Sequence, residues 1–326
     1  MKRDSSSFTC SELTFEEFSF FYSETSNVHD IQHITQSPNY KTTRNNIIFI
    51  GIYREGLLIA LTIAQKYKIL SNIYCIARIN RGPHFLKKIE PSAYNQIFRS
   101  LYKFLKSRKI YFLFIAPNTL QGNDHIKLPL ISFRLPIEGW SSTILKLSND
   151  SEKQFLELKA KWRNTLRKGL KSIVVEEINE MSKFELILIE YLDYANSQSF
   201  KPISSNQLKI WFSTKTKPST AFPKLRVYRA YNPSNESITL GAVGIGDFLN
   251  TSIYLFGFSS LQGKKFHANS VLLWNAIKDS IFLNFSYFDL GGLNSKTPLG
   301  IRRFKEGLNG TPYSMNGEYF SILLFN

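Results

Sequence analysis

The sequence predicts a mixed α/β protein built from two similar units in tandem. Its 326 residues are 43% hydrophobic and 20% charged, which is enough apolar material for sizeable cores. The same order of predicted elements also occurs in each half of the chain: three short strands, an amphipathic helix and a further strand. We therefore expect two α/β units with mixed sheets that arose by duplication.

In the first half, apolar runs over 47–53, 57–67 and 73–79 predict a three-stranded meander. The most apolar window, 45–64, is interrupted by Arg54, Glu55 and Gly56, so it predicts a hairpin and no membrane span. The segment 110–117 is continuously apolar, which predicts a central strand buried on both faces. Between them, 90–109 carries apolar residues at helical spacing, namely Tyr94, Ile97, Phe98, Leu101, Tyr102 and Leu105.

The second half repeats this order. Strands are predicted over 225–231, 238–247 and 252–258, and a last strand over 286–292. The helix before that last strand is marked by Val271, Leu272, Trp274, Ala276, Ile277 and Ile281. The segment 128–143 contains Pro129, Pro136 and Gly139, so we place the boundary near residue 145, with units 1–145 and 146–316.

A basic helix is predicted over 152–171, at the start of the second unit. Leu158, Trp162, Leu166 and Leu170 recur every fourth residue and form an apolar stripe. A cationic stripe follows one residue later, formed by Lys159, Arg163, Arg167 and Lys171. Aligned cations repel one another unless an anion is present. A phosphate-facing surface and an ordinary solvated face remain equal alternatives for this stripe.

The formal net charge of +16 indicates phosphate-bearing partners: nucleic acid, a nucleotide conjugate or an anionic membrane face. The other explanation is that this charge only keeps the protein soluble. The two cysteines, Cys10 and Cys75, exclude a disulfide scaffold and fit a reducing cytoplasm. We expect a cytoplasmic protein, with the inner face of the membrane as a further location.

Cations are also dense near the C-terminus, where the segment GIRRFKEGLNG (300–310) looks too rich in glycine for a helix. Upstream, Asp289 precedes Gly291 and Gly292 at a predicted strand end, where sites in α/β sheets often gather. Asp289 is either a site residue or an aspartate that bonds its own turn. The five histidines, His29, His33, His84, His125 and His267, are scattered, so we expect no metal.

Several segments resemble the Fem-type aminoacyltransferases that build peptidoglycan cross-bridges. The stretch 145–172 is similar to their basic helix, and 266–294 is similar to their acceptor-domain helix and the strand that ends in an aspartate and two glycines. Arg81-Gly82-Pro83 matches a short arginine–glycine–proline signature. The segment 300–319 resembles their closing phenylalanine–lysine motif.

This resemblance implies two acetyltransferase-like (GNAT) domains, a final strand from about residue 317 that returns to the first domain, and no cofactor. It implies an aminoacyl-tRNA donor and a nucleotide- or lipid-linked muropeptide acceptor. Phe304 and Lys305 match the family's pair and are the expected catalytic residues, with Asp289. The expected substrate-binding residues are Arg81, Lys159, Arg163, Arg167, Lys171, Gly291, Gly292, Arg302 and Arg303. The first seventy residues show no match, and no coiled-coil insertion lies between Leu170 and Leu225.

Transfer of an aminoacyl ester to an amine chiefly requires stabilisation of the negative oxygen of the tetrahedral intermediate, which we assign to Lys305, with Phe304 positioning a substrate group. The segment 259–270 has a single glycine, whereas acyl-CoA users carry a glycine-rich turn for pyrophosphate. Two alternatives remain open. One is an N-acyltransferase acting on an amino sugar or surface-polysaccharide precursor with acyl-CoA or another activated donor. The other is a non-catalytic protein that binds RNA or an anionic membrane.

Overall fold

The structure is a computed structural model that describes residues 7–24, 33–39, 46–69, 74–122, 128, 132–215 and 222–323. The chain forms two compact units. The first comprises Met1–Ser141 with Tyr313–Asn326, and the second comprises Ser142–Pro312. The expected histidines His29 and His125 lie outside the described residues, as does Ile73 at the start of an expected strand.

The first unit is built on a sheet with the strand order β1-β2-β3-β4-β6-β15-β7, in which β5 also pairs with β3. Only β4 and β6 are parallel neighbours among these described strands. The strands are β1 (Phe8–Leu13), β2 (Ile47–Arg54), β3 (Leu57–Ile69), β4 (Tyr74–Asn80), β5 (His84–Phe85), β6 (Ile110–Ala116), β7 (Ser132–Arg134) and β15 (Tyr319–Ile322). The helical segments are α1 (Phe15–Ser23), η2 (Ile34–Gln36), η4 (Pro91–Ala93) and α2 (Tyr94–Ser107).

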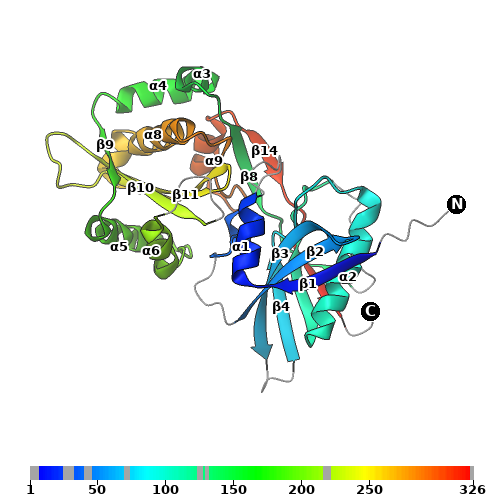
Figure 1. Cartoon of the computed structure of the whole chain (residues 1–326). Helices are drawn as coiled ribbons and strands as arrows, with labels where there is room; N and C mark the ends of the chain where they lie inside the picture. Colours follow the sequence, from blue (N-terminus) through cyan, green and yellow to red (C-terminus); the bar gives the residue numbers. More distant parts are fainter. Residues whose placement is uncertain are drawn as a thin grey trace. The chain divides into compact units, whose positions relative to one another are not determined.

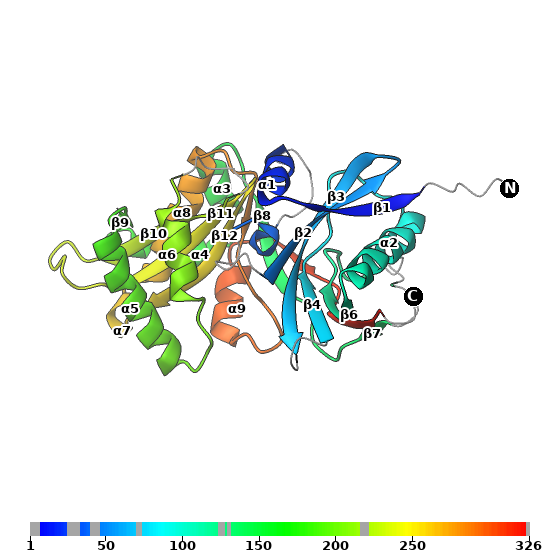
Figure 2. The same ribbon diagram turned by 60° about the horizontal axis from the view of Figure 1, so that its bottom comes forward.

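Helix α2 covers one face of this sheet and packs against β1 and β6 (Figure 2). It buries five of the six side chains that define its apolar stripe, Ile97, Phe98, Leu101, Tyr102 and Leu105. The prediction that the strand at 110–116 is buried on both faces is wrong. Ile110, Leu113 and Ile115 face the α2 core, while the rings of Phe112 and Phe114 stay half-buried against Phe320 of β15.

The second unit contains a sheet with the order β14-β8-β13-β12-β11-β10-β9, where β12 and β13 are parallel. Figure 1 shows α8 on one face of this sheet with α4 packed on it, and α5 and α6 on the other face. The strands are β8 (Ser141–Lys146), β9 (Val174–Ile178), β10 (Lys224–Tyr231), β11 (Gly241–Phe248), β12 (Thr251–Ser259), β13 (Tyr287–Asp289) and β14 (Thr311–Ser314). The helices are α3 (Ser151–Glu157), α4 (Ala160–Gly169), α5 (Met181–Ser197), α6 (Ser205–Ser213), α7 (Leu261–Lys265), α8 (Ala268–Phe282) and α9 (Leu299–Glu306).

The predicted repeat is confirmed. In the first unit the meander β2-β3-β4 is followed by α2 and the parallel strand β6, and in the second β10-β11-β12 is followed by α8 and the parallel strand β13. Each parallel strand then has an antiparallel neighbour on its other side. This neighbour is β15 for β6 and β8 for β13, so the C-terminal strand completes the sheet of the first unit.

Two predictions about helices are wrong. The basic segment forms two helices, because the chain is extended at Leu158 and Lys159, whose ψ angles are 146° and 142°. The apolar stripe ends at Leu166; Leu170 is 50% exposed because α4 stops at Gly169. The segment 300–310, expected to be irregular, begins with a helix, α9. Its glycines stand where helices tolerate them: Gly300 is in the first turn and Gly307 is the C-cap.

The strand expected over 238–247 starts later, at Gly241, because residues 232–238 form a turn that is bonded within itself. Within the described ranges, no helix is long and apolar enough to cross a membrane.

Candidate functional site

The end of β13 carries a buried carboxylate. Asp289 is 1% exposed, and its Oδ1 accepts hydrogen bonds from the Gly291 backbone N at 2.8 Å and from Ser142 Oγ at 2.5 Å. Ser142 lies on β8, and its hydroxyl is also 2.9 Å from the Gly291 carbonyl oxygen. The aspartate therefore bonds its own turn and ties that turn to the neighbouring strand.

Gly291 is the residue that allows this turn to form. Its φ angle is +70°, in the left-handed region that favours glycine. A Cβ atom at this position would lie 2.6 Å from the carbonyl oxygen of Tyr254 on β12. Both observations favour glycine at this position. In the turn that results, the carbonyl groups of Gly291 and Gly292 point at one side chain.

That side chain is Lys305, which is 6% exposed. Its Nζ donates hydrogen bonds to the Gly291 oxygen at 3.1 Å and the Gly292 oxygen at 2.9 Å. It also lies 5.5 Å from the centroid of the Tyr254 ring, in cation–π contact. An ammonium has three N–H bonds, so two go to carbonyls and one is left for another acceptor.

The surroundings of Lys305 weaken its hold on a proton. Burial lowers the pKa of the ammonium from 10.5 to about 8, and the charge of Asp289 acts in the opposite direction. At neutral pH the group is still mostly protonated, and the cation is placed in a poorly hydrated environment. Such perturbed groups gather at functional sites more often than elsewhere.

Helix α9 is held in place by α4. Trp162 Nε1 donates to the Phe304 carbonyl oxygen at 3.1 Å, and the two rings pack with centroids 5.8 Å apart. The Lys159 backbone N donates to the Gly307 oxygen at 3.0 Å. A Cβ atom at Gly307 would lie 2.5 Å from Trp162 Cδ1, so the helix end is in close contact with the indole. Phe304 thus packs against Trp162 and the core of the second unit, and it fixes the helix that carries Lys305.

The other two cations of this helix lie on different faces. Arg302 is half-buried, and its Nη2 donates to the Asn294 oxygen at 3.0 Å, which fastens the loop after β13 to α9. Arg303 is exposed. Arg303 is one residue from Arg302 and two from Lys305, so the helix turns its side chain away from both, whereas Arg302 and Lys305 are three residues apart and are neighbours on the helix surface.

The cationic stripe is partly occupied by local contacts. Arg163 Nη1 donates to the carbonyl oxygens of Leu156 at 2.6 Å and Leu158 at 2.5 Å, which satisfies the C-terminal end of α3. The Arg167 guanidinium lies 5.2 Å from the centroid of the Phe155 ring. Lys159 and Lys171 are exposed, and no acid stands between Glu157 and Glu176.

Arg81, the expected site residue of the first unit, is buried. It is 5% exposed, has a φ angle of +54°, and its guanidinium lies 5.0 Å from the centroid of the Trp140 ring. Gly82 and Pro83 follow it, and a Cβ atom at Gly82 would lie 2.3 Å from Thr62 Oγ1.

Three residues of the second-unit site were missed by sequence analysis. Ser142 and Tyr254 lie on strands far from residue 305 in the sequence, and no spacing pattern links them to it. Trp162 was predicted only as a core residue. Its fourfold spacing indicated burial correctly, but gave no sign of the hydrogen bond to the Phe304 oxygen.

No cluster of three or more metal-ligating side chains occurs within the described part of the chain. The single glycine of the segment 259–270 lies in α7. The N–H of Gly263 is taken by Ser260 Oγ at 3.0 Å, and a Cβ atom there would lie 1.9 Å from the Leu240 oxygen. Close packing therefore explains this glycine.

Neither a scan against protein-family models nor a search of curated protein sequences gave a match. Among solved structures, FemX superposes with a TM-score of 0.74 at 14% sequence identity, over 96% of this chain and 97% of FemX. The chain has the FemX fold. The FemX superposition confirms the tandem fold that the motif resemblance implies.

Two further structures share this fold. One is a tandem GNAT protein from the clavulanic acid biosynthesis pathway, with a TM-score of 0.54 and 7% identity over 97% of this chain and 98% of that one. The other is the C-terminal domain of a candidate lysylphosphatidylglycerol synthetase from Agrobacterium fabrum, with a TM-score of 0.54 and 10% identity over 96% and 93% of the two chains.

Proposed function

We propose that the protein is an acyltransferase that moves an amino acid from aminoacyl-tRNA to an amine of a peptidoglycan precursor. The observation that carries this proposal is the buried ammonium of Lys305, held by two backbone carbonyls at the end of β13. The FemX fold and the net charge of +16 support it as well.

In the proposed reaction, the neutral acceptor amine attacks the carbonyl carbon of the aminoacyl ester. A C–N bond forms, and the carbonyl electron pair moves to oxygen and gives an oxyanion. When the C=O bond re-forms, the ester C–O bond breaks. The amine nitrogen then loses one proton, and the departing tRNA hydroxyl gains one.

The role of Lys305 in this scheme is to donate its remaining N–H bond to the oxyanion. A positioned donor of this kind contributes about 3 to 4 kcal/mol, or roughly a hundred- to a thousand-fold in rate. A cation is suited to the task only while it keeps its net charge. Backbone carbonyls hold an ammonium without neutralising it, unlike a carboxylate at contact distance.

Asp289 and Phe304 act as positioning residues in this proposal. Asp289 Oδ1 is engaged by Ser142 and the turn, so the carboxylate fixes the two carbonyls that receive Lys305, and its charge keeps the ammonium protonated. Phe304 packs against Trp162 and sets the position of α9. Arg302 fastens the loop that carries Gly292.

The donor and the acceptor are tested together. Purified protein is incubated with charged tRNA or with acetyl-CoA, each alongside a nucleotide-linked muropeptide, and the mass of the acceptor is followed. An aminoacyl increment supports the proposal. An acetyl increment instead supports an N-acyltransferase, and no increment with salt-sensitive RNA binding supports a non-catalytic RNA-binding protein. Lys305→Met is the matched control. The proposal requires that this variant lose most or all of the aminoacyl increment.

A further inference from the structure

The first unit contains a buried cation for which the fold supplies no counter-ion. Arg81 is 5% exposed, and its Nη1 and Nη2 atoms are both buried without a hydrogen-bond partner among the described residues. None of the ion pairs found in the described part of the chain involves it. A buried charge without a partner is costly, and structures keep one where it serves a function.

The surroundings of Arg81 orient the guanidinium. The Trp140 ring lies 5.0 Å from the guanidinium carbon, which covers one face of the group by cation–π contact. Such stacking leaves the in-plane N–H bonds of the guanidinium available to other partners. Arg81 also adopts a left-handed backbone conformation, with a φ angle of +54°, which is rare for a residue with a side chain and recurs at ligand sites.

A second donor group lies beside Trp140. The His33 ring is 5.9 Å from the Trp140 ring, centroid to centroid. Burial and the charge of Arg81 both lower the pKa of His33 well below its usual value, so the ring is neutral. Its Nδ1 accepts from the Thr35 backbone N at 3.3 Å, which leaves the ring proton on Nε2. His33 therefore adds an N–H donor and no charge that would neutralise Arg81.

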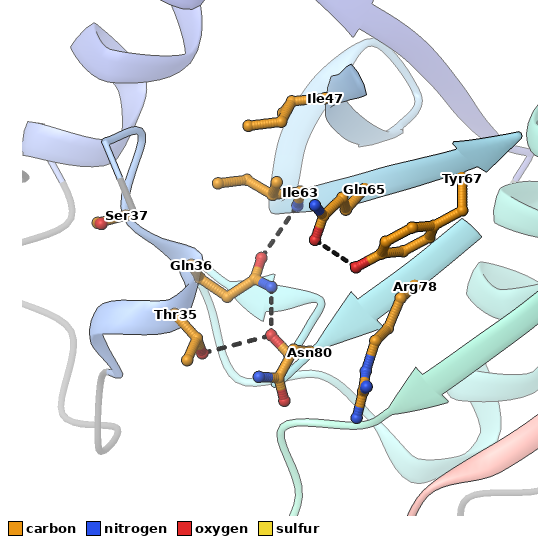
Figure 3. A pocket seen from close by; sticks show the side chains of 9 residues that line it. All are labelled: Thr35, Gln36, Ser37, Ile47, Ile63, Gln65, Tyr67, Arg78 and Asn80. Carbon is orange, nitrogen blue, oxygen red and sulfur yellow. Dashed lines mark hydrogen bonds between the residues drawn. The ribbon is translucent and has the colours of Figure 1, made fainter. Parts of the chain in front are cut away.

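The segment that carries His33 is fixed to β3 and to the end of β4, directly before Arg81. Gln36 Nε2 donates to the Asn80 carbonyl oxygen, and Gln36 Oε1 accepts from the Ile63 backbone N at 3.0 Å (Figure 3). Residues 35–37 and Asn80 also line a pocket of about 260 Å³, on which the buried hydroxyl of Ser37 has no partner among the described residues. Ser37 thus supplies an unused donor within the pocket lining, and Arg81 directly follows the lining residue Asn80 in the chain.

We propose that Arg81 binds an oxyanion of a ligand, a carboxylate or a phosphate group, through Nη1 and Nη2. The fork of an arginine matches both groups, since each offers two oxygens side by side. Trp140 holds the fork in place by stacking. This inference concerns binding in the first unit and is independent of the chemistry at Lys305, so it stands even if no transfer is observed.

The test is a calorimetric titration of the full chain at constant ionic strength, with inorganic phosphate and succinate as separate probes. Arg81→Met removes the fork and keeps most of the side-chain volume. Arg99→Met removes the same charge from an exposed position of α2 and controls for general attraction of anions to a basic protein. We expect saturable one-to-one binding of at least one probe, weakened at least about ten-fold by Arg81→Met and less than about two-fold by Arg99→Met.

The probe that binds identifies the group. Phosphate binding points to a nucleotide or lipid phosphate, and succinate binding points to a peptide carboxylate. Equal weakening in both variants, no weakening in Arg81→Met, or no saturable binding of either probe to the unmodified protein overturns the proposal. If Arg81→Met does not fold, Arg81→Lys replaces it. Lysine keeps the charge without the fork, and an unchanged affinity in that variant overturns the proposal as well.

Discussion

The ammonium of Lys305 is bound by the backbone of Gly291. The lysine Nζ donates to the Gly291 carbonyl oxygen at 3.1 Å, and the position of a Cβ atom on Gly291 would be 3.8 Å from the same nitrogen. The ammonium is therefore held by backbone, in a turn that only glycine can form. Backbone carbonyls do not titrate, so the charge of Lys305 depends on the pKa of the lysine itself.

The rate of transfer should fall at mildly alkaline pH. The pKa of Lys305 is lowered to about 8 by burial, so the protonated form that stabilises the oxyanion is lost above that pH. We expect kcat/KM to decline above about pH 8 in the unmodified protein. The guanidinium introduced by Lys305→Arg would stay charged, so any activity that this variant retains should lack the decline. Identical alkaline limbs in the two proteins would exclude Lys305 as the titrating group.

The same pKa makes a prediction about stability. Because the folded-state pKa of about 8 is below the ordinary value of 10.5, the unfolded chain binds more protons between these two values. The free energy of unfolding should therefore rise with pH across this window, by roughly 3 kcal/mol at most. Chemical denaturation at pH 7 and pH 10.5 measures the effect as the difference between the unmodified protein and Lys305→Met. A pH-independent difference would show that the pKa is not depressed.

Two glycines near Lys305 should respond in opposite ways to alanine. Gly291→Ala introduces a Cβ atom 2.6 Å from the Tyr254 oxygen at a φ angle of +70°, so we expect a loss of about 1–3 kcal/mol in unfolding free energy. Gly300→Ala meets nothing within 4 Å in the first turn of α9, and we expect a gain of up to about 1 kcal/mol. Urea denaturation of both variants checks the pair. Equal changes in unfolding free energy for the two variants would contradict the positive φ angle and close packing described for Gly291.

The cationic stripe should divide into two functional groups. Lys159 and Lys171 are exposed, so replacing both by Gln should weaken tRNA binding and reduce the slope of log affinity against log salt concentration by about one per lost phosphate contact. Arg163→Gln removes the donor to the Leu156 and Leu158 carbonyls, so it should chiefly lower stability, by roughly 1 kcal/mol. Filter binding across a salt series and thermal unfolding separate the two effects. An unchanged salt slope for the double variant would show that Lys159 and Lys171 make no contact with the tRNA phosphates.

Much of the fold was predictable because it depends on local patterns. The apolar spacing of 94–105 and 271–281 marks helices that bury most of those side chains, and the hairpin at Glu55-Gly56 has the positive φ angles that its turn requires. Continuous apolar runs were less informative. One face of the strand at 110–116 is only partly buried, and what covers its rings there is Phe320, a partner more than two hundred residues away.

The site was predictable only in part. Sequence reasoning treated the glycines around Arg302 and Arg303 as obstacles to a helix, although one stands in the first turn and the other at the C-cap. It assigned Lys305, Gly291 and Gly292 to one site, yet a sequence cannot show that the two glycine carbonyls converge on the lysine nitrogen. The contributions of Ser142 and Tyr254 come from strand pairing across the sheet, which no local pattern encodes.

The most direct test of the role of Lys305 is a single-turnover measurement of aminoacyl transfer with Lys305→Met and Arg303→Met. Both substitutions remove one cation from α9, but only Lys305 is buried beside the Gly291 and Gly292 carbonyls. We predict that Lys305→Met slows transfer by roughly a hundred- to a thousand-fold with unchanged circular dichroism, while Arg303→Met stays within a few-fold of the unmodified protein. Transfer by Lys305→Met at the unmodified rate would contradict the assignment of the oxyanion to this ammonium.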